Sequence, residues 1–368
     1  MLTRDGCQQR LGRLRRAMAD RGVDTAVIAE RKNVYYFSGH LSSPHTRAAL
    51  VVTDATATLA AGALAPLAAE QQAALAATDV RTFVANAHAS TIRPDQDERL
   101  AELVAGIDVT GRVGGDLPHC PLLLAPLLGT EPIDLTDGIR QMRRTKDADE
   151  LTLLRQAAAC VDACYAHARQ RIEPGLNELT LHGELYRVAV ETAGEEIDRF
   201  GQDFQSASVG GPSRDRAAGT GELWILDLGV EYRGYTADAS RAFAVSGVAS
   251  DAQQEAWQLV AGTLQAAADD LRAGASCLQL FQDARAALDA RYPGAFFHHL
   301  GHGLGLAAHE APYLNPEFDD HLVAGDVVTV EPGVYDPSLV AGIRLENDFV
   351  ITDDGAEQIT HAELGLER

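Results

Sequence analysis

Apolar runs and amphipathic stretches alternate along the first third of the chain. The apolar runs have the length of buried strands, and the stretches between them show helical periodicity, an alternation that predicts a small α/β domain. The expected strands include Thr25–Ala29 and Leu50–Thr53, and the expected helices lie around Arg10–Arg21, Leu64–Ala76 and Asp95–Ala105.

A segment rich in Pro and Leu, at residues 118–132, follows this pattern. Its apolar content is more typical of a covering loop or a short helix than of an exposed linker. We expect the domain boundary to come after it, near residues 135–145. The chain is therefore divided into an N-terminal domain, residues 1–134, and a C-terminal domain, residues 135–368.

The C-terminal pattern predicts two pairs of helices with strands between and after them. Asp147 and Glu150 have the spacing of a capping box, which begins an amphipathic helix that should run to about Arg171. A Pro-Gly pair then breaks the chain, and Asn177 is placed to cap a second helix that should run to about Thr192. Further helices are expected at Gln253–Leu271 and Cys277–Ala290, and strands at Leu223–Gly229, Ala237–Val245, Val327–Val330 and Arg344–Thr352.

Composition narrows the class of protein and its partners. Of 368 residues 46% are hydrophobic, which is enough for a sizeable core in about two domains. The 53 acidic residues outnumber the 31 basic ones, so we expect neither nucleic acid nor a membrane surface as a partner. Five cysteines form no CxxC pair, and no stretch has the form of a signal peptide or a membrane span. The sequence therefore predicts a cytoplasmic protein.

Two aspartates stand on strand-like segments that a hairpin could bring together. Asp227 ends an apolar run, and Asp238 lies on the next expected strand. Buried carboxylates cost several kcal/mol unless a cation or hydrogen bonds compensate them, and adjacent like charges raise that cost. A shared cation would remove the difficulty. Taken alone, such a pair is more often a surface or ion-paired feature.

Three more residues of ligand type stand on separate apolar segments. His302 lies in a Gly-rich run, Glu331 closes an apolar strand, and Glu346 comes two residues after Arg344. Each has an ordinary explanation as a turn, a strand-end charge or an ion pair. Together with the two aspartates they provide four carboxylates and one imidazole, a ligand set that suits two divalent ions. A water shared by two such ions becomes a nucleophile near neutral pH.

These five positions, in this order, resemble the pita-bread metallopeptidase family, which includes Xaa-Pro aminopeptidase, prolidase, methionine aminopeptidase and creatinase. Residues 13–24 and 33–39 are similar to the N-terminal domain of creatinase and prolidase. The resemblance implies an α+β class, with a small α/β N-terminal domain followed by a pita-bread catalytic domain. It also implies a homodimer and two bound divalent ions. Mn²⁺ or Co²⁺ is expected first, and Zn²⁺ and Fe²⁺ are the alternatives.

The resemblance assigns a role to each ligand residue. It implies that Asp227 chelates one ion, that His302 and Glu331 chelate the other, and that Asp238 and Glu346 bridge both. Glu331 would also handle the proton of the bridging water.

Three further residues match positions that face the substrate in this family. His309 would form a hydrogen bond to the substrate, and His298 would line the pocket. Arg344 would orient the carboxylate end of the substrate or secure the metal site. The neighbouring His299 is expected to be structural.

One departure from the family concerns the loop before Asp227. Xaa-Pro-directed members and creatinase place a substrate-facing histidine there, whereas this chain has no histidine between Phe200 and Asp227. Arg214, Asp215 or Arg216 would have to take its place. An arginine favours an anionic group over a neutral carbonyl, so we expect weak Xaa-Pro turnover and a preference for acidic substrates.

Three functions remain open at this stage. The leading one is a dinuclear-metal hydrolase, similar to Xaa-Pro peptidases, that cleaves a small peptide or amide with a metal-bridging hydroxide. The second is a creatinase-like C–N hydrolase or lyase that acts on a small non-peptide metabolite. The third is a binding module without turnover, which the complete ligand set argues against.

Overall fold

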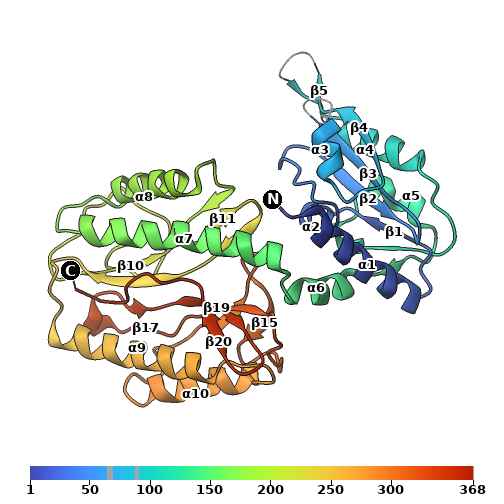
Figure 1. Cartoon of the computed structure of the whole chain (residues 1–368). Coiled ribbons are helices and arrows are strands. Elements are labelled where there is room, and N and C mark those ends of the chain that lie inside the picture. Colours follow the sequence, from blue (N-terminus) through green and yellow to red (C-terminus); the bar gives the residue numbers. More distant parts are fainter. Residues whose placement is uncertain (64–68, 88–90, 368) are drawn as a thin grey trace. The chain divides into compact units, whose positions relative to one another are not determined.

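The computed structural model describes residues 1–63, 69–87 and 91–367 (Figure 1). The chain forms two compact units, Met1–Arg143 and Arg144–Arg368. The helix α6 (Thr136–Arg144) lies almost wholly in the first unit, because its Met142 carbonyl accepts a hydrogen bond from the Tyr36 hydroxyl at 2.8 Å. The unit boundary is therefore later than residue 134. Residues 64–68 of the expected helix Leu64–Ala76 lie outside the described residues.

The N-terminal unit contains a six-stranded mixed sheet with the order β4-β3-β2-β1-β7-β8. The central strand β1 is buried along its whole length, which its continuous apolar sequence predicts. The strands are β1 (Thr25–Ile28), β2 (Ala48–Val52), β3 (Ala57–Ala63), β4 (Asp79–Val84), β7 (Val113–Gly115) and β8 (Ile133–Asp134), and a separate pair is β5 (Asn86–Ala87) with β6 (Thr91–Ile92).

Helices pack around this sheet. The Pro- and Leu-rich segment forms short helices, as expected, and its Leu124 and Leu128 pack with Leu100 and Val104 in one apolar cluster. The helices are α1 (Arg4–Asp20), α2 (Arg31–Ser38), α3 (Ala69–Ala74), α4 (Gln96–Ala105) and α5 (Ala125–Leu128), with 3₁₀ turns η1 (Leu117–His119) and η2 (Leu122–Leu124).

Two helix pairs frame the C-terminal unit. The capping box forms, since the Asp147 amide donates to Glu150 Oε2 at 2.9 Å, and the Asn177 side chain accepts from the Leu179 amide at 2.9 Å. The helices are α7 (Ala148–Arg171), α8 (Glu178–Ala193), α9 (Asp251–Asp270) and α10 (Cys277–Asp289). All four expected helices are therefore confirmed to within two residues at each end.

The strands of this unit form several small sheets. β10 pairs with β13, β12-β11-β9 form a second sheet, and β15-β14-β16-β19-β20 form a third, with β17 and β18 as a further pair. Their bounds are β9 (Arg199–Phe200), β10 (Leu223–Asp227), β11 (Val230–Tyr232), β12 (Tyr235–Ala237), β13 (Ser240–Ala244), β14 (Gly301–Gly303), β15 (Glu310–Leu314), β16 (Val327–Val330), β17 (Gly333–Val334), β18 (Ile343–Arg344), β19 (Asn347–Ile351) and β20 (Ala356–Gln358), with the 3₁₀ turn η3 (Pro337–Leu339).

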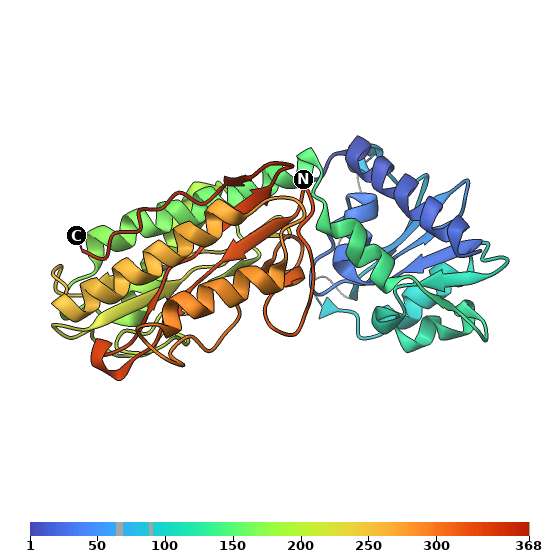
Figure 2. The ribbon, with the colours of Figure 1, turned by 90° about the horizontal axis from the view of Figure 1, so that it is seen from below.

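The strands lie between the two helix pairs, with α7 and α8 on one side and α9 and α10 on the other (Figure 1). In Figure 2 the two orange helices, α9 and α10, run side by side along one face of the strands. Residues of β10, β16 and these helices form one apolar core that includes Ile225, Leu264, Phe281 and Val328. Within the described ranges, no helix is both long and apolar enough to cross a membrane.

Candidate metal centre

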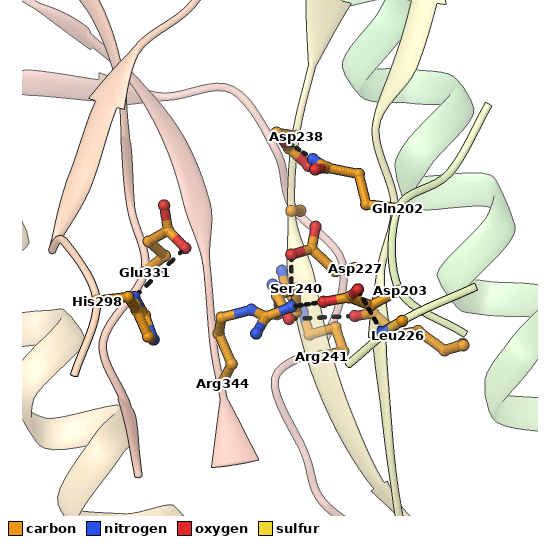
Figure 3. Close-up of polar contacts among 12 residues, drawn as sticks. Gln202, Asp203, Leu226, Asp227, Asp238, Ser240, Arg241, His298, Glu331 and Arg344 are labelled. Carbon is orange, nitrogen blue, oxygen red and sulfur yellow. Dashed lines mark hydrogen bonds and ion pairs between the residues drawn. The ribbon is translucent and has the colours of Figure 1, made fainter. Parts of the chain in front are cut away.

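The five predicted ligand residues line a single cavity of about 240 Å³ in the C-terminal unit. They are Asp227, Asp238, His302, Glu331 and Glu346, and none is more than 7% exposed. Figure 3 shows Asp227 and Asp238 on one side of the site and Glu331 and Arg344 on the other. The structure therefore brings together residues that are more than a hundred positions apart in the chain.

Backbone pairing explains this convergence. β10 pairs with β13 so that Asp227 lies opposite Ser240, and the Glu346 amide donates to the Ser240 carbonyl at 3.0 Å. On the other side, the His302 amide donates to Thr329 Oγ1 at 3.1 Å. β10 and β13 pair antiparallel, and β11 and β12 form a second hairpin between them, so Asp238 follows β12 and does not lie on the strand Ala237–Val245 that the sequence predicted.

The carboxylates leave polar atoms that a cation would satisfy. In the described part of the chain, Asp227 Oδ1, Asp238 Oδ1 and Glu346 Oε2 are buried oxygens with no hydrogen-bond partner. One potential ligand atom each from Asp238, His302 and Glu346 lies within 4.8 Å of the others. A buried carboxylate oxygen without a partner is costly, so this arrangement fits a bound divalent ion.

The electrostatics of these acids agree with that reading. Burial raises the pKa of Asp238 and of Glu346 well above the ordinary range, and the nearby carboxylates raise both further. Burial also raises the pKa of Asp227 to about 6, although the positive charge of Arg344 opposes the shift. Without a cation these groups tend to keep their protons, and a divalent ion would replace them.

His302 presents a neutral imidazole to the cavity. Its Nδ1 lies 3.1 Å from the Gly303 carbonyl, so this nitrogen carries the proton and Nε2 keeps its lone pair. Burial lowers the pKa of His302 to about 4. Its Nε2 is 3.6 Å from Glu331 Oε1. The imidazole is therefore in the protonation state that a metal ligand needs.

His309 and His298, which the family resemblance associates with the substrate, also line the cavity. The His309 ring stacks on the His302 ring with centroids 3.7 Å apart. His298 Nε2 lies 2.9 Å from the Tyr335 hydroxyl, and its Nδ1 lies 2.8 Å from the His299 carbonyl. Burial lowers the pKa of His298 to about 4, so this side chain is neutral.

Arg344 contacts acidic residues of the site. One terminal nitrogen donates to Asp227 Oδ2 at 2.6 Å and to Asp203, and the other donates to the Tyr335 hydroxyl at 2.8 Å. These contacts tie Arg344 to two acids and a tyrosine that line the cavity. The Arg344 side chain is only 9% exposed and has little surface for a substrate carboxylate.

The polar residues expected to replace the loop histidine lie elsewhere. Arg214 Nη2 pairs with Glu178 at 2.7 Å, Arg216 Nη1 lies 2.9 Å from Glu222, and Asp215 accepts from the Asn177 side chain at 2.9 Å. None of the three lines the cavity. The expectation that one of them faces the substrate is wrong, and the predicted preference for acidic substrates loses its basis.

Two residues that the sequence did not single out line the cavity instead. The Gln202 side-chain amide donates to Asp238 Oδ2 at 2.5 Å, and Asp203 binds Arg344 and accepts from the Gly211 amide at 2.6 Å (Figure 3). The segment that carries them pairs with β10, because the Asp203 and Asp227 backbones exchange hydrogen bonds of 3.0 and 3.1 Å. No local sequence pattern marks that pairing.

His299 was expected to be structural, and the structure instead places its side chain in the cavity. Its Nε2 is 2.8 Å from Glu331 Oε1. Burial raises the pKa of Glu331, but the hydrogen bond from His299 and the nearby histidines outweigh burial and hold it at about 2. A second histidine next to the Gly-rich run was the only sequence signal for this residue.

Known proteins resemble both units of the chain. Residues 152–353 match the model of metallopeptidase family M24, and residues 10–145 match that of the creatinase/prolidase N-terminal domain. The uncharacterized peptidase YqhT of Bacillus subtilis is 31% identical over 65% of this chain and 68% of its own length. A probable dipeptidase, PepE of Mycobacterium tuberculosis, is 29% identical over 96% of this chain and 94% of its own.

The fold has solved counterparts. The prolidase of Pyrococcus horikoshii superposes with a TM-score of 0.82 at 25% identity and covers 97% of this chain and 99% of its own. The dipeptidase PepE of Mycobacterium ulcerans superposes with a TM-score of 0.77 at 26% identity, over 99% and 98% of the two chains. The two-domain α+β architecture expected from the sequence is confirmed. The chain therefore belongs to metallopeptidase family M24, with the pita-bread fold, and is a peptidase-type hydrolase.

Proposed function

We propose that this protein is a dinuclear-metal peptidase that cleaves peptides of about dipeptide size. The observation that supports this most directly is the convergence of five ligand-type side chains, three with buried oxygens that have no partner, on one cavity. A volume of about 240 Å³ is below the roughly 300–1,000 Å³ of pockets for drug-sized ligands, so the substrate is small.

The ligand residues divide between two ions. Asp227 would hold one ion, His302 and Glu331 the other, and Asp238 and Glu346 would contact both. Mn²⁺ and Co²⁺ suit this carboxylate-rich set first, and Zn²⁺ and Fe²⁺ are the alternatives. When bound, the ions supply Lewis acidity and lower the pKa of a coordinated water.

Glu331 and His309 have the properties that proton transfer and substrate binding need. The pKa of Glu331, at about 2, keeps its carboxylate ionised, the form that a metal ligand needs. We propose that Glu331 also handles the proton of the metal-bound water. Burial lowers the pKa of His309, so its imidazole is neutral. It can therefore donate a hydrogen bond to a peptide carbonyl without demanding a negative charge.

The cavity mouth favours apolar substrates. Phe297 and Val209 line the cavity and are 66% and 48% exposed, so they can contact a substrate side chain. Arg344 acts through Asp227 and Asp203, since its guanidinium already binds both. We propose that His298 lines the pocket wall and positions Tyr335 and the His299 backbone.

A turnover screen tests this function. Apoprotein loaded with Mn²⁺ or Co²⁺ is given free dipeptides, N-acetylated dipeptides, Xaa-Pro dipeptides and small non-peptide amides. We expect an apolar dipeptide to be cleaved with kcat/KM of roughly 10⁴ M⁻¹s⁻¹ or more, with chelators abolishing the activity. Turnover of no peptide by protein that has taken up metal would contradict the proposal.

The loop between Phe200 and Asp227 is the reason to test a second function, that of a creatinase-like C–N hydrolase. No side chain of this loop offers an imidazole to the cavity, and Gln202, Asp203 and Val209 line it instead. Loss of one hydrogen-bond donor costs on the order of a hundredfold in turnover, so we expect Xaa-Pro dipeptides to be poor substrates. Cleavage of small amides in preference to dipeptides would favour a creatinase-like C–N hydrolase.

We propose a cytoplasmic homodimer, the dimer from family resemblance and the compartment from the odd number of cysteines, five, which form no CxxC pair. Light scattering at micromolar concentration that gives the mass of one chain would contradict the dimer.

A further inference from the structure

Three histidines meet at one side of the cavity, and only His302 belongs to the five-residue ligand set. One potential ligand atom each of His299, His302 and His309 lies within 4.8 Å of the others. An ion bound in this region could therefore have more than the single nitrogen ligand, from His302, that the five-residue set supplies.

Ring orientation decides which of these imidazoles can share an ion. The His302 and His309 rings are stacked, with an interplanar angle of 15°, so their in-plane lone pairs point side by side rather than at one point. The His299 ring is nearly perpendicular to both, at 83° to His302 and 87° to His309. His299 and His302 can therefore converge on one ion, and the stacked pair cannot.

Glu331 provides the third atom of this group. Its Oε1 lies 2.8 Å from His299 Nε2 and 3.6 Å from His302 Nε2. Metal–ligand bonds of about 2.0–2.2 Å place neighbouring ligand atoms of one ion roughly 3–3.5 Å apart. Both distances lie within about 0.2 Å of that range, so small side-chain shifts would bring both nitrogens and Glu331 Oε1 to one ion.

The backbone of His299 is held by a chain of contacts along the cavity wall. Its carbonyl contacts His298 Nδ1 at 2.8 Å, and the Nε2 of His298 contacts the Tyr335 hydroxyl, which Arg344 also binds. Both ring nitrogens of His298 are engaged by these contacts. His298 is therefore a positioning residue for its neighbour rather than a ligand.

We propose that His299 is an additional nitrogen ligand of the ion held by His302 and Glu331. This inference rests on the proposed dinuclear centre and adds an asymmetry to it. One ion then has two imidazoles, whereas the ion at Asp227 has only carboxylates. Imidazole suits Zn²⁺, Co²⁺ and Fe²⁺, and carboxylate suits Mn²⁺, so the His299 ion prefers Zn²⁺ or Co²⁺ over Mn²⁺.

Metal titrations of the full-length protein test the affinity. Zn²⁺ and Mn²⁺ binding are measured by calorimetry on metal-free wild type, His299→Ala, His299→Gln and His361→Ala, where His361 is an exposed histidine outside the cavity. We expect His299→Ala and His299→Gln to weaken the binding of one Zn²⁺ ion by at least about 10- to 100-fold and to weaken Mn²⁺ binding less. The His361→Ala variant should bind both metals with wild-type affinity. Circular dichroism checks that each variant is folded.

Spectroscopy separates a ligand from a hydrogen-bond partner of Glu331. In Co²⁺-loaded wild type we expect exchangeable, paramagnetically shifted imidazole N–H signals from two coordinated histidines, and from one in His299→Ala. Unchanged signals in His299→Ala, or wild-type Zn²⁺ affinity in His299→Gln, which keeps an amide donor, would overturn the inference. Wild-type protein that binds no metal would instead overturn the proposed function.

Discussion

At the scale of single residues, the buried carboxylates have opposite effects with and without metal. Asp238 is 1% exposed, and its Oδ1 has no partner among the described residues. In the metal-free fold Asp238 must keep a proton that the unfolded chain has lost at neutral pH, so Asp238→Asn should raise the free energy of unfolding of the metal-free protein by about 1–3 kcal/mol. The same change should weaken binding of both ions.

Thermal unfolding with and without Mn²⁺ checks this reversal. The metal-free variant should melt above metal-free wild type, and the metal-loaded variant below metal-loaded wild type. Asp215→Asn, a change at an exposed position, is the matched control. A metal-free Asp238→Asn that melts below wild type would show that the carboxylate stabilises the fold by itself.

Arg344 gives a second prediction at this scale. It is the cation between Asp203 and Asp227, so Arg344→Met leaves two acids without their partner. Breaking a buried pair by removing one member costs about 3–5 kcal/mol, and urea unfolding of the metal-free protein should show this loss. Asp203→Asn should cost less, because Arg344 keeps Asp227. Losses below about 1 kcal/mol for both variants would contradict this role.

The sequence identified the ligands but not their surroundings, for a physical reason. Asp227 and Glu331 each come at the end of an apolar strand, and a charged residue in that position can be recognised from the sequence alone. Gln202 and Asp203 reach the cavity only because their segment pairs with β10, a contact between residues more than twenty positions apart. His299 was expected to be structural, and only the folded chain places its side chain next to Glu331.

At the scale of elements, local signals were sufficient for the helices. The capping box at Asp147 and the Asn177 cap fixed the starts of α7 and α8, because caps act within a few residues. The strands were less well predicted. Ala237–Val245 reads as one apolar run, but the chain leaves one sheet after Ala237 and joins another at Ser240.

Arg214 yields a prediction about the loop and α8. Its guanidinium and amide bind Glu178, whose side chain is fully buried at the start of α8. Arg214→Ala should lower the free energy of unfolding by about 1–3 kcal/mol, because it removes a partner of a buried carboxylate. Arg216→Ala, which breaks a more exposed pair with Glu222, should cost less than about 1 kcal/mol.

Neither arginine variant should alter substrate choice. The ratio of kcat/KM for a neutral to an acidic dipeptide should be the same in both variants as in wild type. A selective loss of acidic substrates in Arg214→Ala would mean that this side chain does reach the substrate.

At the scale of the whole molecule, metal and protons compete for the same groups. Asp227, Asp238 and Glu346 have raised pKa values, so above about pH 4 these three groups bind more protons in the metal-free folded state than in the unfolded chain. Their contribution to the free energy of unfolding therefore falls as pH rises from about 4 to the Asp227 pKa of about 6, whereas His298 and His302, whose pKa burial lowers to about 4, contribute with the opposite sign. Metal-loaded protein should lack this decline.

Calorimetry in buffers of different ionisation enthalpy measures how many protons are released when metal binds. Metal binding near pH 6 should release protons, since the ions displace them from the carboxyl groups. Metal binding to Asp238→Asn should release fewer protons than metal binding to wild type. Metal uptake with no proton release would show that the carboxylates are already ionised in the metal-free fold.

The account depends above all on two divalent ions in the C-terminal unit. The most direct measurement is elemental analysis of purified protein after loading with Mn²⁺ or Co²⁺ and removal of free metal, together with thermal unfolding before and after chelation. We predict about two ions per chain and a melting temperature that falls when they are removed. Protein that retains no metal, and whose melting temperature is indifferent to chelators, would contradict the central claim.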